Sequence, residues 1–300
     1  MNPFLVTLLL GVLLVVFAKL IFDRCEFARP IVWLLALIPY GVVHLASIDL
    51  APFYRMVLLC SVLMAGMKWV VYSEWRRNGR AILNWSRWFC FGFLWFGMEP
   101  MAWVGKRRAL EWKRDAYWGL GCCVVGVLAL VLMAGIHVSA VIPLFIAMSL
   151  GFHYGALRLL TAFWRLQGRP VRALFRNPLV TQGFADFWGN RWNLAYSQMM
   201  ARAVKRPLQR KLGRRGALFG VFIISGVLHE LAITVPVQAG YGLPTCFFLL
   251  QGTFTVFEKR GGIWPGILCG ASLLVTFPLL FPIAFVEAVI IPVRNVLNFN

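Results

Sequence analysis

Acidic residues are scarce in this chain, and charge of either sign is sparse. Only 11 of the 300 residues are Asp or Glu, and 14% of all residues are charged, against about 25% in a soluble domain. Long apolar runs recur from one end of the chain to the other. The sequence therefore predicts a polytopic membrane protein and argues against a soluble domain with a single anchor.

Several motifs of soluble enzymes are also missing. The chain has no nucleotide P-loop, no GxSxG elbow and no HExxH zinc motif. Its seven cysteines include no pair spaced for a metal, so we expect small buried thiols, no structural disulfide and no zinc site. His229-Glu230 lacks a second His at helical spacing, which argues against a zinc hydrolase. We expect neither a metal nor a resident cofactor.

Basic residues are abundant by comparison. Thirty Lys and Arg give a net charge of +19, and they lie in short segments between the apolar runs. This distribution argues against a nucleic-acid partner. It favours contacts with anionic membrane lipids, and it is also compatible with a polyanionic substrate.

The apolar runs predict an all-α bundle with about eight transmembrane helices. They cover residues 3–22, 31–48, 53–72, 117–136, 140–160, 216–235, 242–257 and 263–293. The last run contains Pro278, Pro282 and Pro292, which predicts one crossing with a kinked or interfacial extension. Residues 83–98 are apolar but short and rich in Trp. They predict an interfacial or re-entrant segment, with a full crossing as the alternative.

The loops predict an orientation. Residues 73–116, 165–215 and 258–260 are basic, whereas the turns near residues 49, 138 and 238 carry almost no Lys or Arg. Eight crossings with the N-terminus outside place every basic segment on the cytoplasmic side. We therefore expect a multi-pass protein of the inner membrane if the source is bacterial, or of the endoplasmic reticulum if it is eukaryotic.

One histidine differs from the others in its neighbours. His229 lies in the apolar run 217–235, and Ser225 is one helical turn before it on the same face. An ionisable group at membrane depth is costly, so it indicates function. Apolar surroundings favour the neutral imidazole, which can accept a proton from an alcohol. Glu230 points elsewhere, and we expect it to anchor the helix.

The remaining histidines are weaker candidates. We expect His44 to be a packing residue within its run and His137 to be solvated at an outer turn. His153 either packs or lines the chamber.

An aromatic block at residues 186–193 is the second candidate region. The Asn193 carboxamide can donate to a carbonyl oxygen on which negative charge develops, although a helix cap or a packing hydrogen bond also fits. Arg191 can contact a phosphate or a lipid head group. Trp188 and Trp192 either contact a substrate or lie at the membrane interface.

Together the two regions resemble a known family. The sequences DFWGNRWN at 186–193 and SGVLHE at 225–230 resemble the ordered F-W-x-x-R-W-N and S-G-x-x-H-E blocks of the membrane-bound O-acyltransferase family, in its wax synthase-like branch. The separation of 36 residues between Asn193 and His229 also suits that family. The similarity covers about residues 150–260.

The resemblance implies a helical fold around a tunnel that acyl-CoA enters from the cytoplasmic side. It implies one membrane-embedded acyltransferase domain over residues 1–300, in which His229 is the essential base and Asn193 its partner. The expected reaction moves an acyl group from acyl-CoA, a co-substrate, to a hydroxyl of a hydrophobic acceptor such as a long-chain alcohol, a sterol or another lipid. The expected substrate contacts are Arg191, Trp188, Trp192, Ser225 and Glu230.

Two other functions remain open at this point. His229 and Glu230 could relay protons or bind an ion in a transporter or flippase, or the chain could be a non-catalytic scaffold. If the enzyme hypothesis holds, residues 179–193 fold into the mouth of the bundle, because they are too polar to cross and too aromatic for a free loop. Asn193 and His229 then share one cavity, with His229 roughly 20 Å along its helix.

Overall fold

All regular secondary structure in the described part of the chain is helical. The computed structural model describes residues 3–105, 110–133, 141–258 and 264–292, and these ranges contain no strand. Five of their helices are long and apolar enough to cross a membrane, or six if one bent pair counts as a single span. The prediction of a polytopic all-α membrane protein is confirmed, but these helices are fewer than the eight crossings expected.

The apolar helix α12 (Leu243–Phe257) explains part of this difference. It has 15 residues, so it is about 22 Å long, whereas the hydrocarbon core of a bilayer is about 30 Å thick. Hydropathy detects such a helix as readily as a longer one. An apolar run of this length therefore does not establish a full crossing.

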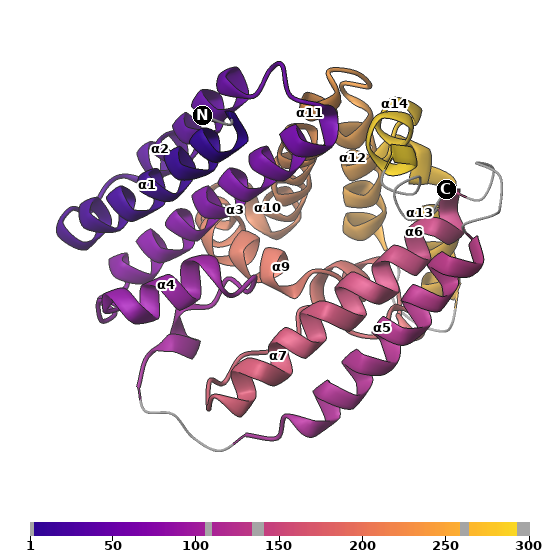
Figure 1. Ribbon diagram of the computed structural model, residues 1–300, viewed down its shortest axis with the longest axis horizontal. Coiled ribbons are helices and arrows are strands. Elements are labelled where there is room, and N and C mark those ends of the chain that lie inside the picture. The colour runs from indigo at the N-terminus through magenta and orange to yellow at the C-terminus, as the bar shows by residue number, and fades with distance from the viewer. Residues whose placement is uncertain (1–2, 106–109, 134–140, 259–263, 293–300) are drawn as a thin grey trace.

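The N-terminal part is a three-helix unit. It consists of α1 (Pro3–Arg24), α2 (Arg29–Ala46) and α3 (Pro52–Arg77). Helix α3 packs against both α1 and α2, and these helices lie together on one side of the molecule (Figure 1). Pro30 and Pro52 occupy the first turns of α2 and α3, where a missing N–H removes no helical hydrogen bond.

The Trp-rich segment after α3 does not cross the membrane. It contains α4 (Trp85–Phe93), of nine residues, and a single 3₁₀ turn, η1 (Pro100–Trp103). The Asn84 side chain caps α4 by accepting a hydrogen bond from the Arg87 backbone N–H at 3.0 Å. Nine residues span only about 14 Å, which is too short for a full crossing, and the interpretation as an interfacial or re-entrant segment is retained.

A buried lysine holds this segment against α3. Lys68 is 1% exposed, and its Nζ donates to the carbonyls of Phe91 at 2.9 Å, Trp95 at 2.8 Å and Gly97. It also lies 4.1 Å from the centre of the Phe91 ring. An ammonium has three donor hydrogens, so these carbonyls use all of them.

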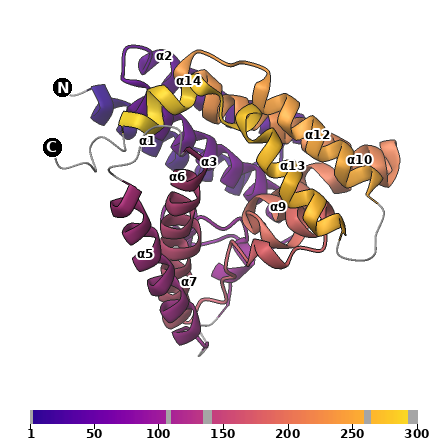
Figure 2. The same ribbon diagram turned by 90° about the vertical axis from the view of Figure 1, so that its right-hand side faces the viewer.

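The middle of the chain forms a second unit. Its elements are α5 (Lys113–Met133), α6 (Val141–Ser149), η3 (Leu150–Ala156) and α7 (Leu157–Leu166). The last three run as one 26-residue helix that packs along α5. At the contact a Cβ on Gly126 would lie 2.5 Å from the Gly151 nitrogen, and Asp115 of α5 pairs with Arg158 and Arg165 of α7. This unit leans away from the helices that follow it (Figure 2).

The third unit carries the aromatic block and His229. Its elements between residues 178 and 237 are, in chain order, η4 (Pro178–Val180), α8 (Phe184–Asp186), η5 (Phe187–Arg191), α9 (Leu194–Met200), η6 (Ala201–Lys205), α10 (Arg206–His229), η7 (Glu230–Thr234) and α11 (Val235–Val237). Residues 194–237 form one helical run, with a kink at Gly213, where φ is 67°. The sequence predicted this helix over residues 216–235 only. The prediction was too short, because the basic residues before position 216 are also helical.

The remaining helices pack beside this run. Helix α10 packs on α12, and α12 packs on α13 (Trp264–Leu280). A bend of 69° separates α13 from the helical segment formed by α14 (Ile283–Phe285) and η8 (Val286–Ile290). This bend confirms the kink expected in the last apolar run, and it lies at residues 281–282, which include Pro282. His137 lies outside the described residues.

Candidate functional site

The aromatic block belongs to a folded segment anchored at both ends. The Arg176 N–H donates to the Arg191 carbonyl at 2.9 Å, and the Leu194 N–H donates to the Leu174 carbonyl at 2.8 Å. These two backbone hydrogen bonds fold residues 174–194 back on themselves. The aromatic block therefore sits on a fixed loop immediately before α9.

Glu258, at the end of α12, anchors the same segment from the other side. Its carboxylate accepts the backbone N–H groups of Phe184 at 2.6 Å and Ala185 at 3.1 Å. This approach requires a glycine at position 183, where φ is 140° and a Cβ would lie 2.0 Å from Glu258 Oε1. The segment and α12 are thereby fixed to each other.

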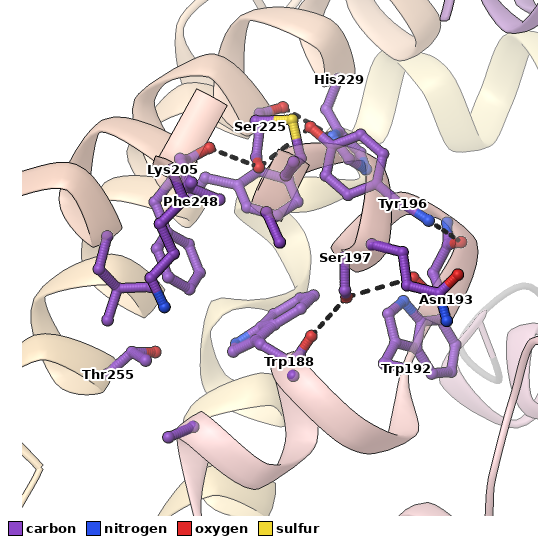
Figure 3. Close-up of a pocket in the computed structure, with 18 of the residues that line it drawn as sticks. Trp188, Trp192, Asn193, Tyr196, Ser197, Lys205, Ser225, His229, Phe248 and Thr255 are labelled. Atoms are coloured by element: carbon purple, nitrogen blue, oxygen red, sulfur yellow. Dashed lines mark hydrogen bonds between the residues drawn. The ribbon is translucent and has the colours of Figure 1, made fainter. Parts of the chain in front are cut away.

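A pocket of about 440 Å³ lies between this segment, α10 and α12. Its wall includes Trp188, Trp192, Asn193 and Tyr196 from the segment and α9, and Ser225 and His229 from α10 (Figure 3). Its size is within the range of small-molecule sites. The structure thus brings Asn193 and His229 to one cavity, as the sequence predicted, although 36 residues separate them.

Asn193 occupies a special backbone position at the start of α9. Its φ is 41°, in the left-handed region that Asn tolerates better than most residues. Its Oδ1 accepts the Tyr196 backbone N–H at 3.2 Å, so the side chain caps the helix. With Oδ1 used in this way, the amide Nδ2 makes no hydrogen bond to any part of the chain that the structure describes.

His229 ends α10 with its imidazole in a fixed orientation. Its Nδ1 lies 2.7 Å from the Ser225 carbonyl oxygen. A carbonyl can only accept, so Nδ1 carries the hydrogen, and Nε2 of the neutral ring has a free lone pair. The imidazole lies between the rings of Phe248, 4.2 Å away, and Tyr196, 6.1 Å away, measured between ring centres.

Ser225 orients the His229 imidazole through its backbone carbonyl, while its side chain makes other contacts. Its hydroxyl donates to the Val221 carbonyl at 2.8 Å and accepts a hydrogen bond from the Tyr196 hydroxyl at 3.0 Å. Neither Tyr196 nor Phe248 was found from the sequence. The only local signal for Tyr196 was its place three residues after a candidate helix cap, at Asn193.

Arg191 does not line the pocket. Its guanidinium pairs with Asp186 and donates to the Asn177 carbonyl at 3.0 Å. Burial alone would raise the pKa of the Asp186 carboxyl, but hydrogen bonds from Arg191, the Gln182 backbone N–H and Asn190 hold this pKa below its ordinary value. The carboxylate therefore stays charged and binds Arg191 within the segment. The expected contact between Arg191 and a substrate phosphate is not supported.

Glu230 also has a structural position. Its carboxylate accepts hydrogen bonds from the Thr245 N–H at 2.9 Å, the Thr245 hydroxyl at 2.8 Å and the Thr234 hydroxyl at 2.6 Å. Glu230 therefore anchors the end of α10 to the start of α12, as expected, and it does not line the pocket with His229. A proton relay from His229 to Glu230 thus loses its geometric basis, and so does a substrate contact at Glu230.

Two basic side chains, Lys205 and Arg214, also line the pocket. Neither makes an ion pair or hydrogen bond with the described residues. In Figure 3 Lys205 and Thr255 lie on the opposite side of the view from Asn193. The pocket thus has a basic region apart from the Asn193 and His229 side chains.

The other described histidines are held by neighbouring side chains. The His153 ring packs at a tilt against the rings of Phe175 and Trp192, with ring centres 4.6 and 5.5 Å away, and its Nδ1 lies 3.0 Å from the Ser149 hydroxyl. His44 Nδ1 lies 2.9 Å from the Arg55 guanidinium. Neither lines the pocket, which agrees with the prediction that His44 is a packing residue.

Three π-helical turns border the pocket. Residues 187–191, 201–205 and 230–234 adopt this conformation, next to or including Trp188, Lys205 and His229. π-turns are rare and concentrate at functional sites, because each one redirects the side chains that follow it. Two further π-helical segments, at residues 150–156 and 286–290, lie outside the pocket wall, so these turns are consistent with a functional site here but do not identify it alone.

Comparison with known proteins gives an independent result for the same region. Residues 171–250 match the Membrane bound O-acyl transferase family. A probable long-chain-alcohol O-fatty-acyltransferase 2 of Arabidopsis thaliana is 33% identical over 102 residues, which cover 31% of this chain and 30% of the relative. The long-chain-alcohol O-fatty-acyltransferase of Simmondsia chinensis is 32% identical over 93 residues, 28% of this chain and 26% of the relative.

A third relative has a different acceptor in its name. The acyl-CoA–sterol O-acyltransferase 1 of Arabidopsis thaliana is 34% identical over 64 residues, 19% of each chain. In all three comparisons the chain matches less than a third of the relative's length. The matched family region contains both Asn193 and His229, and the resemblance inferred from the two sequence blocks is confirmed.

Proposed function

We propose that this protein is an integral-membrane O-acyltransferase that moves an acyl group from acyl-CoA to a hydroxyl of a hydrophobic acceptor. The observation that carries the proposal is the shared pocket of His229 and Asn193. Its wall includes His229 Nε2, which can accept a proton, and Asn193 Nδ2, which can donate a hydrogen bond, and neither is hydrogen-bonded to the described residues. The family match over residues 171–250 supports the same reaction class.

In the proposed mechanism His229 is the general base. Nε2 takes the proton of the acceptor hydroxyl while Nδ1 stays bonded to the Ser225 carbonyl. The hydroxyl oxygen attacks the thioester carbonyl, and Asn193 Nδ2 donates to the oxyanion that forms. When the intermediate collapses, the C–S bond breaks and the CoA sulfur takes the proton from His229. The step needs no acyl-enzyme, no metal and no resident cofactor.

The basic part of the pocket is the proposed binding site for the donor. Lys205 and Arg214 line the pocket and carry charge that is not paired within the described residues. The phosphates of CoA are a matching polyanion. This assignment replaces Arg191, which is bound to Asp186.

The apolar part of the pocket is the proposed path for the acyl chain and the acceptor. Trp188, Phe222 and Phe248 contribute aromatic surface close to the reactive groups. The relatives' names include both long-chain alcohols and a sterol. We therefore propose a lipid alcohol as the acceptor class, and a wax ester is one such product.

One assay tests the proposed function. The protein, purified in detergent, is incubated with radiolabelled acyl-CoA and either a long-chain alcohol, a sterol or no acceptor. We expect a labelled ester that depends on the acceptor. Proton- or ion-coupled uptake in vesicles without any ester formation would instead favour a transporter that uses His229 and Glu230.

The proposed orientation has its own test. We propose that the basic segments face the cytoplasm, so Gln209, in the basic part of the helical run 194–237, and Tyr241, just after the end of that run, face opposite sides of the membrane. In a cysteine-free background, an impermeant thiol reagent added outside intact cells should label Tyr241→Cys and not Gln209→Cys. The reverse result would overturn the orientation and the proposed route of CoA.

A further inference from the structure

One residue joins the two parts of the site, although it belongs to neither sequence block. The backbone N–H of Tyr196 donates to Asn193 Oδ1 at 3.2 Å, and its phenol hydroxyl donates to Ser225 Oγ at 3.0 Å. Figure 3 shows the Tyr196 side chain between Asn193 and the Ser225–His229 pair. Tyr196 thus connects α9 to α10 at the pocket wall.

The direction of these hydrogen bonds is fixed by the donors available. The single proton of the Ser225 hydroxyl is given to the Val221 carbonyl at 2.8 Å, so Ser225 Oγ accepts from Tyr196 and not the reverse. The carbonyl of the same Ser225 residue holds His229 Nδ1 at 2.7 Å. Tyr196 therefore bonds to the residue that orients the imidazole.

The ring of Tyr196 also contacts the imidazole directly. The two rings meet edge to face, with an angle of 78° between their planes, while Phe248 covers the imidazole with its ring inclined at 41°. Rotation of the His229 side chain would therefore displace one of these rings and break the Nδ1 hydrogen bond. The imidazole is confined to one orientation, with Tyr196 as part of the confinement.

We propose that Tyr196 is a positioning residue for acyl transfer, holding His229 Nε2 and Asn193 Nδ2 in a fixed mutual geometry at the pocket. This inference rests on the function proposed above, because it assigns a role in that reaction. Small misplacements of reacting groups cost rate more than they cost binding. The role therefore predicts an effect on kcat with little effect on KM.

The test uses Tyr196→Phe, which keeps the ring and the backbone N–H and removes only the hydroxyl. We expect kcat to fall by about tenfold while KM for acyl-CoA and for the alcohol changes by less than about twofold. Tyr40→Phe is the matched control, because the Tyr40 hydroxyl donates to the Leu231 carbonyl at 2.7 Å, on the helical segment directly after His229. Tyr40 does not line the pocket, so this variant should keep the wild-type kcat.

A double-mutant cycle with Ser225→Ala separates positioning from general destabilisation. If the hydroxyl acts through Ser225, the Tyr196→Phe/Ser225→Ala variant should lose no more kcat than the more impaired single variant. Losses that multiply would overturn the inference, and so would a wild-type kcat in Tyr196→Phe. Should Tyr196→Phe fail to fold, Ser225→Ala alone decides, because it removes the same hydrogen bond. A wild-type protein without any ester formation would instead refute the proposed function.

Discussion

Lys68 and His229 are both ionisable residues within membrane helices, Lys68 fully buried and His229 partly buried, and their hydrogen bonding differs in one respect. All three ammonium hydrogens of Lys68 are used by backbone carbonyls of the re-entrant segment. His229 uses Nδ1 in a hydrogen bond with Ser225, and its Nε2 makes none with the described residues, while its ring lines a pocket. The first site is closed and fully bonded, and the second is open.

This difference distinguishes a structural from a chemical role better than burial does. Burial of an ionisable group in a membrane is costly in both cases. At Lys68 the cost is offset by hydrogen bonds that fix a re-entrant segment. At His229 a reactive atom remains available to a ligand. Substitutions at the two sites should therefore separate activity from stability.

The largest loss of activity is expected from His229→Ala. Removal of the proposed base should lower kcat by about a thousandfold, with the thermal unfolding temperature close to that of the wild type. Ester formation from labelled acyl-CoA measures the first quantity and scanning fluorimetry the second. His44→Ala is the control and should lose far less activity per folded molecule. Comparable losses in the two variants would remove His229 from the mechanism.

Asn193→Asp should have the next largest effect. An aspartate caps a helix as well as an asparagine, but it cannot donate to an oxyanion, so kcat should fall by about a hundredfold with little loss of stability. Asn193→Ala is the comparison, because it removes both the cap and the donor. It should also lower the free energy of unfolding by about 1 kcal/mol. Full activity in Asn193→Asp would leave Asn193 as a helix cap only.

The double variant Lys205→Gln/Arg214→Gln should affect binding and not chemistry. We expect KM for acyl-CoA to rise about tenfold at unchanged kcat, because two charge-assisted contacts with phosphate are lost. The ratio of variant to wild-type KM should shrink at high salt, which screens such contacts. Arg210→Gln, an exposed position outside the pocket wall, is the control. An equal rise in KM for the control would mean that Lys205 and Arg214 act only through general positive charge and make no specific contact with CoA.

Lys68→Met should change activity least and stability most. Three buried carbonyls lose their donor, which is only partly offset by removing a buried charge, so the free energy of unfolding should fall by about 3 kcal/mol. Thermal unfolding in detergent measures this, with Lys211→Met, at an exposed position, as the control. The kcat of the folded fraction should stay within about twofold of the wild type. A large loss of kcat would contradict the division between closed and open sites.

The features predicted from the sequence were those that depend on composition and chain order. Apolar runs indicated the membrane fold, the richness in Trp and the short length of residues 83–98 indicated a segment that does not cross, and prolines indicated the bend after α13. The two motif blocks indicated a pocket shared by Asn193 and His229. Each of these inferences needs only local chemistry or a recognised order of residues.

Features that depend on unusual local geometry were not predictable. Asp186 and Arg191 are five residues apart, a spacing that separates side chains on an α-helix. The π-helical turn over residues 187–191 brings them together, so nothing in the sequence indicated that Arg191 pairs with Asp186 within its own segment. The role of Lys68 was not predicted either. Its partners are backbone carbonyls, and these are present at every residue, so no side-chain pattern in the sequence marks them.

The contact made by Lys68 also has a consequence for biosynthesis. The carbonyl of Gly97 lies 29 residues after Lys68 in the chain, and translation proceeds at roughly 5–20 residues per second. For a period on the order of seconds, α3 therefore carries a lysine whose final partners have not yet emerged from the ribosome. A lysine at the centre of a membrane helix disfavours insertion by about 3 kcal/mol. Synthesis of the segment that supplies these carbonyls should accordingly favour the inserted state of α3, and a chain that stops short of Gly97 should integrate less efficiently than a longer one.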